Sequence, residues 1–81
     1  MTKDDAYQRL VSMLEADFQV PRDSISEETK LRTDLGLDSL AVMELVADAE
    51  DRFRVTIPNE ILTELVTVDD VARAIHRLQG A

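Results

Sequence analysis

Three segments of this 81-residue chain repeat apolar residues at the three- and four-residue spacing of an amphipathic helix. No other feature of the sequence restricts the range of possible folds as much. The first covers residues 2–18, the second begins at Asp38 or Ser39 and ends at Phe53 or Arg54, and the third follows Thr67. Their apolar stripes are Ala6, Tyr7, Leu10, Val11, Leu14 and Phe18; Val42, Leu45, Val46, Ala49 and Phe53; and Val68, Val71, Ala72, Ile75 and Leu78. No stretch alternates apolar and polar residues as a β-strand does. The sequence therefore predicts an all-α fold.

Capping residues mark the ends of the predicted helices. Thr2 with Asp5, and Thr67 with Asp70, have the spacing of a capping box, in which each side chain accepts from the other residue's backbone N–H. Gly80 follows the last stripe and is typical of the residue that ends a helix. These signals predict that the first helix starts next to Thr2 and the last one next to Thr67.

Residues 59–65 predict a short additional helix between the second and third stripes, with Asn59 as its N-cap and Ile61, Leu62 and Leu65 directed inward. Three longer helices and one short third helix form a small four-helix bundle. A chain of this length supports one hydrophobic core, so we expect a single domain over residues 1–81.

A long connection, residues 19–37, shows no periodicity and contains turn-forming residues such as Pro21 and Gly36. Connections of this length are uncommon in compact domains and are often functional. Apolar residues are spread through it, namely Val20, Ile25, Leu31, Leu35 and Leu37. We therefore expect the loop to be pinned to the core, with a short helical turn near residues 31–35.

Acidic residues outnumber basic ones by 17 to 9, which gives a formal net charge of −8. Residues 34–64 hold eight acids and two bases, and so contribute −6 of this charge: Asp34, Asp38, Glu44, Asp48, Glu50, Asp51, Glu60 and Glu64 against Arg52 and Arg54. Nucleic acids and anionic membranes repel such a chain, so a basic protein is the expected partner. No apolar run reaches membrane-spanning length and residues 1–5 do not resemble a signal peptide, so we expect a soluble, cytoplasmic monomer.

Residues that commonly carry chemistry are scarce. The chain has no cysteine, which excludes disulfides, thiol chemistry and cysteine-based zinc sites, and His76 is its single histidine. No nucleophile has a histidine base near it in sequence, and the two glycines form no phosphate-binding loop. We therefore expect a protein that is not an enzyme and holds no metal.

One arrangement stands out at residues 34–40, DLGLDSL, where Ser39 lies at the junction between the long loop and the second helix. The simplest interpretation is that Asp38 or Ser39 is a helix N-cap. A helix start also suits a covalently attached phosphate, because its free N–H groups and the helix dipole stabilise an anion. Exposed apolar residues mixed with acids on the adjacent helix face favour this second interpretation.

Leu31, the segments DLGLDSL (34–40) and MELV (43–46), Phe53 and the Ile57-Pro58 pair together resemble the acyl carrier proteins of fatty acid and polyketide synthesis. The similarity continues to TVDDV at residues 67–71. It implies that Ser39 carries 4′-phosphopantetheine, which a phosphopantetheinyl transferase transfers from coenzyme A. It also implies that Asp38 helps the transferase to place its metal and substrate. The thiol of the attached arm then holds acyl groups as thioesters, which a chain without cysteine cannot do alone.

The outward face of the second helix is the expected recognition surface for ketosynthase, acyltransferase and other thioester-processing enzymes. It comprises Leu40, Met43, Glu44, Ala47, Asp48 and Asp51. The acids attract basic side chains of a partner, and the apolar residues supply a small contact. Each exposed charge contributes little, often below about 1 kcal/mol, which suits a carrier that leaves its partner after each step. A solvated helix face is the alternative for these acids.

The resemblance further implies that acyl chains slip between the second, third and fourth helices. The predicted cavity residues are Val46, Ala49, Ile57, Leu62, Leu65 and Ile75. Ala49 is small where a bulkier residue would fill space, which leaves room for an acyl chain. Ordinary core packing is the alternative for each of these residues.

Several alternatives stay open from the sequence. The segment EDRFR (50–54), with Ile61 and Thr63, is less acidic than is usual in fatty acid carriers, which favours a carrier dedicated to polyketide or other specialised synthesis. A peptidyl or aminoacyl carrier is an alternative, although Leu37-Asp38 before the serine favours acyl cargo. The chain could also be a domain of a multimodular synthase, although Met1 indicates a natural start. Outside the family, a small acidic adaptor would use Ser39 only as a cap or phosphorylation site.

Overall fold

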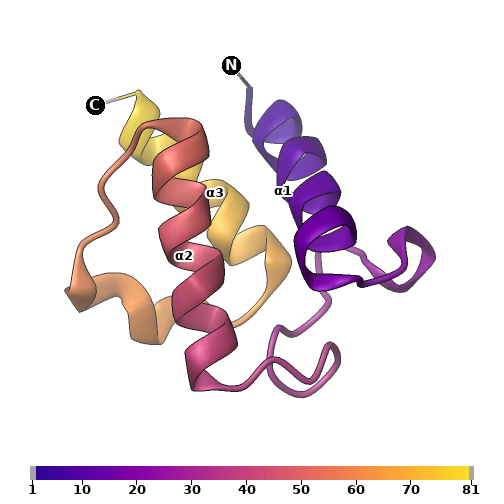
Figure 1. Cartoon of the computed structure of the whole chain (residues 1–81). Coiled ribbons are helices and arrows are strands. Elements are labelled where there is room, and N and C mark those ends of the chain that lie inside the picture. Colours follow the sequence, from indigo (N-terminus) through magenta and orange to yellow (C-terminus); the bar gives the residue numbers. More distant parts are fainter. Residues whose placement is uncertain (1, 81) are drawn as a thin grey trace.

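The computed structural model describes residues 2–80 and shows a small helical bundle (Figure 1). Its elements are α1 (Lys3–Phe18), the 3₁₀-helix η1 (Arg22–Ser24), α2 (Ser39–Phe53), the 3₁₀-helix η2 (Asn59–Glu64) and α3 (Val68–Gln79). The long loop brings the chain to the end of the bundle opposite the start of α1, and α2 begins there. Among the described residues, β-pairing is limited to one isolated bridge between Lys30 and Thr67. The prediction of an all-α bundle with three longer helices is confirmed.

Both predicted capping boxes are present. The Thr2 hydroxyl accepts from the Asp5 N–H at 3.1 Å, and the Asp5 carboxylate accepts from the Thr2 N–H at 3.2 Å. Thr67 and Asp70 repeat this exchange at the start of α3, at 3.1 and 2.9 Å. Each box satisfies backbone donors that the first helical turn leaves without partners. The two helix starts are therefore determined by residues only three positions apart.

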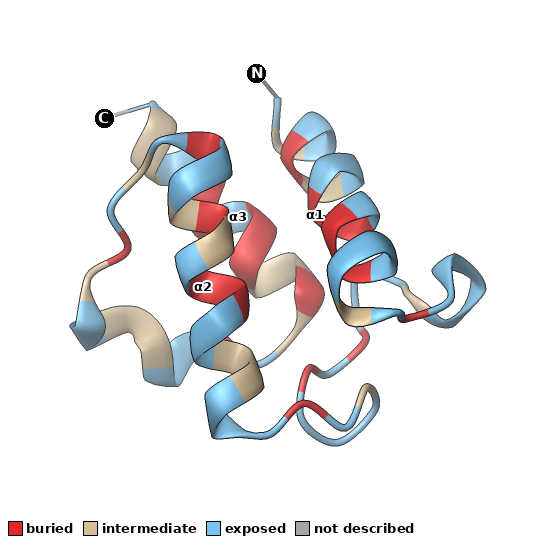
Figure 2. Cartoon of the chain, viewed as in Figure 1, coloured by how far each residue is buried: buried red, intermediate tan, exposed pale blue. Residues whose placement is uncertain are grey.

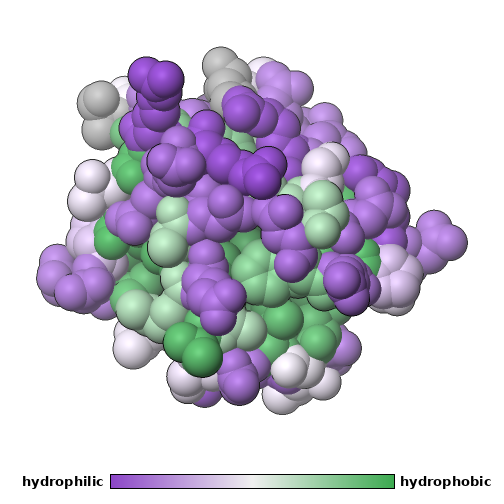
Figure 3. Space-filling model, viewed as in Figure 1, coloured by the Kyte–Doolittle hydropathy of each residue, from purple (hydrophilic) through white to green (hydrophobic). Residues whose placement is uncertain are grey.

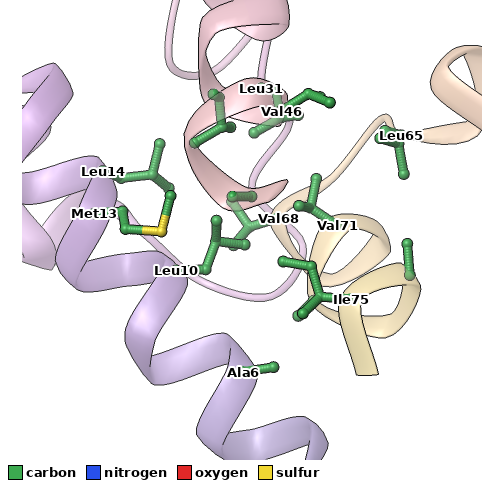
Figure 4. Packing of buried hydrophobic residues seen from close by; sticks show 14 of the residues in the cluster. Ala6, Leu10, Met13, Leu14, Leu31, Val46, Leu65, Val68, Val71 and Ile75 are labelled. Atoms are coloured by element: carbon green, nitrogen blue, oxygen red, sulfur yellow. The ribbon is translucent and has the colours of Figure 1, made fainter. Parts of the chain in front are cut away.

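The core lies where the three α-helices face one another (Figure 2). Leu10 of α1 is directed toward Val68 and Ile75 of α3, and Val46 of α2 closes the cluster from the other side (Figure 4). All of the predicted stripe residues of α2 are buried except Val42, which is half-buried. Among the described residues, no helix combines the length and apolar character needed to cross a membrane.

The long loop is pinned to the core, as expected. Val20, Leu31 and Leu37 are buried, and Ile25 and Leu35 pack against the core cluster. The Leu31 N–H donates to the Val66 carbonyl at 2.9 Å, and the Val68 N–H donates to the Thr29 carbonyl at 2.9 Å. These bonds tie the loop to the junction between η2 and α3. The expected turn at residues 31–35 is present.

The short helices correct the sequence prediction at two points. The third helix spans Asn59–Glu64 as a 3₁₀-helix, and Pro58, not Asn59, occupies the N-cap position without a side-chain cap. The fixed φ of proline, here −62°, sets the entry to this helix. The structure also contains η1, which the loop sequence did not predict, because three residues are too few for a periodic signal.

Candidate functional site

Ser39 is the first residue of α2, and its side chain is exposed. Just before it, Gly36 has φ +71°, a left-handed conformation that side-chain-bearing residues rarely adopt. Leu37 follows and is buried, and its N–H donates to the Leu31 carbonyl at 3.1 Å. The loop is thus anchored within two residues of Ser39, so the hydroxyl projects outward from a fixed base.

Asp38 is the N-cap of α2. Its Oδ1 accepts from the Ala41 N–H at 2.8 Å, and its carbonyl accepts from the Val42 N–H at 2.9 Å. The capping interpretation of Asp38 therefore applies, while Ser39 lies one residue inside the helix. A serine at this position is not required for the cap, which leaves its hydroxyl available for another role.

Arg32 is a site residue that the sequence analysis missed. Its Nη2 donates to the Ser39 Oγ at 2.9 Å. The two residues are seven positions apart, and the turn at residues 31–35 folds one back toward the other. Sequence reasoning had no signal for this contact, because the residues between the two positions form a turn and loop and not a continuous helix, so no regular spacing applies.

The predicted recognition surface is largely exposed on α2, where hydrophobic patches interrupt a hydrophilic surface (Figure 3). Leu40 and Met43 are 68% and 51% exposed, unusually high values for large apolar side chains. Glu44, Ala47 and Asp51 are also exposed. The structure thus brings Ser39 and these five residues together on one accessible helix.

Asp48 differs from the other acids of this surface. It is half-buried and pairs with Arg52 at 3.1 Å, and Arg52 also pairs with Asp17 of α1 at 3.0 Å. The neighbouring Asp48 carboxylate raises the pKa of Asp17, against the opposing charge of Arg52. The Asp48 carboxylate is therefore engaged within the molecule, whereas no ion pair engages Glu44 or Asp51 among residues 2–80.

The predicted cavity residues lie in or against the core. Leu62 is partly buried and packs against the core cluster. The other five are buried: Val46, Ala49, Ile57, Leu65 and Ile75. Leu65 also lines a surface hollow of ≈ 220 Å³ between η2 and α3, together with Ile61 and Ala74 and a rim of Glu64, Asp70, Arg73 and Arg77. These side chains are thus packed in the core, and Leu65 also borders the hollow.

Comparison with known proteins starts from protein families. The family model described as "Phosphopantetheine attachment site" matches residues 8–75. The matched range includes the loop, Ser39, the outward face of α2 and most of α3.

Individual proteins agree with the family match. An acyl carrier protein of an Exiguobacterium species is 44% identical over 79 residues, covering 94% of this chain and 96% of the relative. An acyl carrier protein of Lactobacillus acidophilus is 30% identical over 80 residues, covering 99% of this chain and all of the relative. The crystal structure of an acyl carrier protein from Thermotoga maritima superposes with a TM-score of 0.83 at 22% identity, covering 96% of this chain and 91% of that one, and shows that the fold is shared.

Proposed function

The chain belongs to the phosphopantetheine attachment-site family as an acyl carrier protein, and from this premise we propose that the Ser39 hydroxyl is where its arm is attached. An acyl carrier protein is not a catalyst. It holds acyl intermediates as thioesters on covalently bound 4′-phosphopantetheine, and it interacts with phosphopantetheinyl transferases and biosynthetic enzymes. The observation that carries the proposal is the exposed Ser39 hydroxyl at the first residue of α2, next to an anchored loop.

The residues around Ser39 fit a phosphate-linked group. The first N–H groups of a helix have no acceptors within it, and the helix dipole is positive at this end. Arg32 supplies one guanidinium donor, Nη2, to the Ser39 Oγ. When bound, the arm supplies the thiol that forms the thioester, and the chain supplies a rigid base and donors for the phosphate. Asp38 holds the start of α2 in place, and we propose that it also supports the transferase during attachment.

We propose that partner enzymes, including ketosynthase and acyltransferase, dock on the predicted recognition surface of α2. Leu40 and Met43 supply apolar contact beside the attachment point, and Glu44 and Asp51 supply accessible negative charge. Asp48 contributes more weakly, because Arg52 neutralises it. A carrier of this kind acts as a cytoplasmic monomer that meets each enzyme transiently.

We further propose that the acyl chain enters the bundle from the η2 side, toward Val46, Ala49, Ile57, Leu62, Leu65 and Ile75. Two observations support this route: Leu65 joins the hollow to the core, and η2 lacks a side-chain cap. A 3₁₀-helix has poorer hydrogen-bond geometry than an α-helix, so η2 is the element that yields at least cost. Amide exchange of residues 59–65 should slow when a long acyl chain is attached.

The attachment proposal is tested by intact mass. The chain is incubated with coenzyme A, Mg²⁺ and a permissive phosphopantetheinyl transferase, and it should gain one arm. Ser39→Ala should gain none and keep its unfolding midpoint, since Asp38 provides the cap. Ser24→Ala, at another exposed serine of the loop region, is the matched control and should load normally. Loading of Ser39→Ala, or an unloaded native chain, would show that Ser39 is not the attachment site.

The pathway is a separate proposal. The pairing of Arg52 with both Asp48 and Asp17 makes the second half of α2 less acidic, which favours a dedicated polyketide partner over general fatty acid enzymes. Acyl transfer from the loaded chain to a polyketide ketosynthase and to a fatty acid ketosynthase should be compared at equal salt. Faster transfer to the fatty acid enzyme would exclude the polyketide specialisation.

A further inference from the structure

Arg32 lies beside Ser39 and contacts its hydroxyl. The turn that carries it is anchored on both sides along the chain: Leu31 is 1% exposed and donates to the Val66 carbonyl, and Leu37 donates to the Leu31 carbonyl. The Arg32 side chain leaves this anchored turn and donates from Nη2 to the Ser39 Oγ at 2.9 Å. A guanidinium held at the oxygen that would become an ester is in position to contact whatever is bonded to that oxygen.

Given the proposed attachment at Ser39, we propose that Arg32 is a positioning residue that holds the phosphodiester of the attached arm. Attachment replaces the hydroxyl hydrogen with phosphorus, so the Ser39 Oγ becomes a bridging oxygen and a weaker acceptor. The same phosphate carries its negative charge on two non-bridging oxygens, which are stronger acceptors for a guanidinium. The planar fork of arginine matches two such oxygens, so the hydrogen bond moves from Oγ to the phosphate.

The charges around Ser39 make this contact more important. The arm brings a negative phosphate to a chain of net charge −8, at a serine that follows Asp34 and Asp38 within five residues of the sequence. Both carboxylates already accept from backbone donors, Asp34 from the Lys30 N–H at 2.8 Å and Asp38 from the Ala41 N–H at 2.8 Å. Arg32 is the cation that the fold holds at the attachment oxygen, so it offsets the repulsion and restrains the base of the arm on the loop side.

The experiment uses four loaded proteins, each first shown by intact mass to carry one arm: the native chain, Arg32→Gln, Arg32→Lys and Arg54→Gln. Arg54 is the charge-matched control, because it follows the last residue of the 15-residue α2 and so lies about 22 Å from Ser39. The readout is the ³¹P NMR shift of the phosphodiester at low and high salt, with no partner enzyme present.

The native chain and Arg54→Gln should share one ³¹P shift that moves as salt screens the contact. Arg32→Gln should show a different shift with little salt dependence, and Arg32→Lys an intermediate one, since lysine keeps the charge without the fork. The gain in unfolding temperature on loading should fall by about 2 to 4 °C in Arg32→Gln, as expected for one partly exposed charged contact in a domain of this size.

Identical shifts and salt dependence in all four loaded proteins would overturn the proposal, even if Arg32→Gln loads slowly, because slow loading alone assigns Arg32 to the transferase encounter. A native chain that gains no arm overturns the attachment at Ser39 and this inference with it. The mass measurement separates this failure from that of Arg32 alone.

Discussion

The contact between α1 and α3 and the outward face of α2 are opposite kinds of surface. Between α1 and α3, Leu10 and Ile75 are fully buried, and Lys3 at the start of α1 pairs with Asp69 of α3 at 2.6 Å and with Glu27 of the loop at 3.0 Å. On the outward face of α2, Leu40 and Met43 remain exposed beside Ser39. The first region joins three parts of the chain, and the second is left open to solvent.

This difference shows how a chain of 81 residues can combine a stable core with a surface suited to reversible binding of partners. Stability comes from apolar burial and caps around α1 and α3, so α2 needs only its inner face for the core. Its outer face is free to combine apolar and acidic residues near the attachment point, a combination that weak and reversible docking requires. Substitutions in the two regions should therefore have separable effects.

Truncation of a leucine gives the largest contrast. Leu10→Ala should lower the free energy of unfolding by about 2 to 5 kcal/mol, because it leaves a cavity among α1 and α3 residues. Leu40→Ala, the same chemical change on the exposed face, should change it by less than about 0.5 kcal/mol. Urea denaturation followed by circular dichroism measures both. Equal losses would mean that the two regions do not differ in their contribution to stability.

Charge reversal tests the open face. Glu44→Lys with Asp51→Lys should slow thioester transfer to a partner enzyme about tenfold at low salt, roughly the cost of losing two exposed attractions. The effect should shrink at high salt, where such charges are screened. Asp23→Lys with Glu28→Lys makes the same change in net charge in the exposed loop and is the control. Equal slowing by the control would indicate a net-charge effect and not a docking site.

Removal of a cap tests the junction between loop and α3. Thr67→Ala should cost about 1 kcal/mol of unfolding free energy, since the Asp70 N–H loses its acceptor. Thr67→Ser keeps the hydroxyl and should retain most of the stability. Chemical denaturation measures the loss, and loading at Ser39 should be unchanged. Impaired loading in Thr67→Ala would show that the start of α3 and the attachment site are coupled.

The smallest effect concerns pH. The hydrogen bond from Lys3 holds the pKa of Asp69 below its ordinary value of 3.8, and its bond to Asp69 raises the pKa of Lys3. A carboxylate with a lowered folded-state pKa contributes stability above pH 3.8, and this contribution disappears as pH falls through the folded-state value. Lys3→Met should therefore flatten the fall in unfolding temperature below pH 4.

Lys30→Met is the control for the pH experiment, because Lys30 is exposed and forms no ion pair within the described part of the chain. It should leave the acid limb of the curve as in the native chain. The same flattening in both variants would mean that net charge, and not the pair between Lys3 and Asp69, sets the acid limb.

Local features of this fold were predictable from sequence. The stripes of α1, α2 and α3 and the boxes at Thr2 and Thr67 depend on residues three or four positions apart, so the pattern contains them directly. The buried apolar residues of the loop were also predicted, because their side chains have no other favourable place. The extents of the short helices were not predictable, because a 3₁₀-helix of three to six residues is too short for a clear periodic pattern and Pro58 offers no capping side chain to recognise.

The sequence by itself determined an all-α bundle, its family and a serine at the start of the second helix, since these follow from helical periodicity and from contiguous motifs. Only the tertiary structure decided that Arg32 reaches Ser39 and that Arg52 of α2 also pairs with Asp17 of α1. The physical reason is that charge and hydrogen-bond partners are chosen by distance in space. The turn of the loop and the packing of α1 against α2 set that distance, and neither is encoded by spacing along the chain.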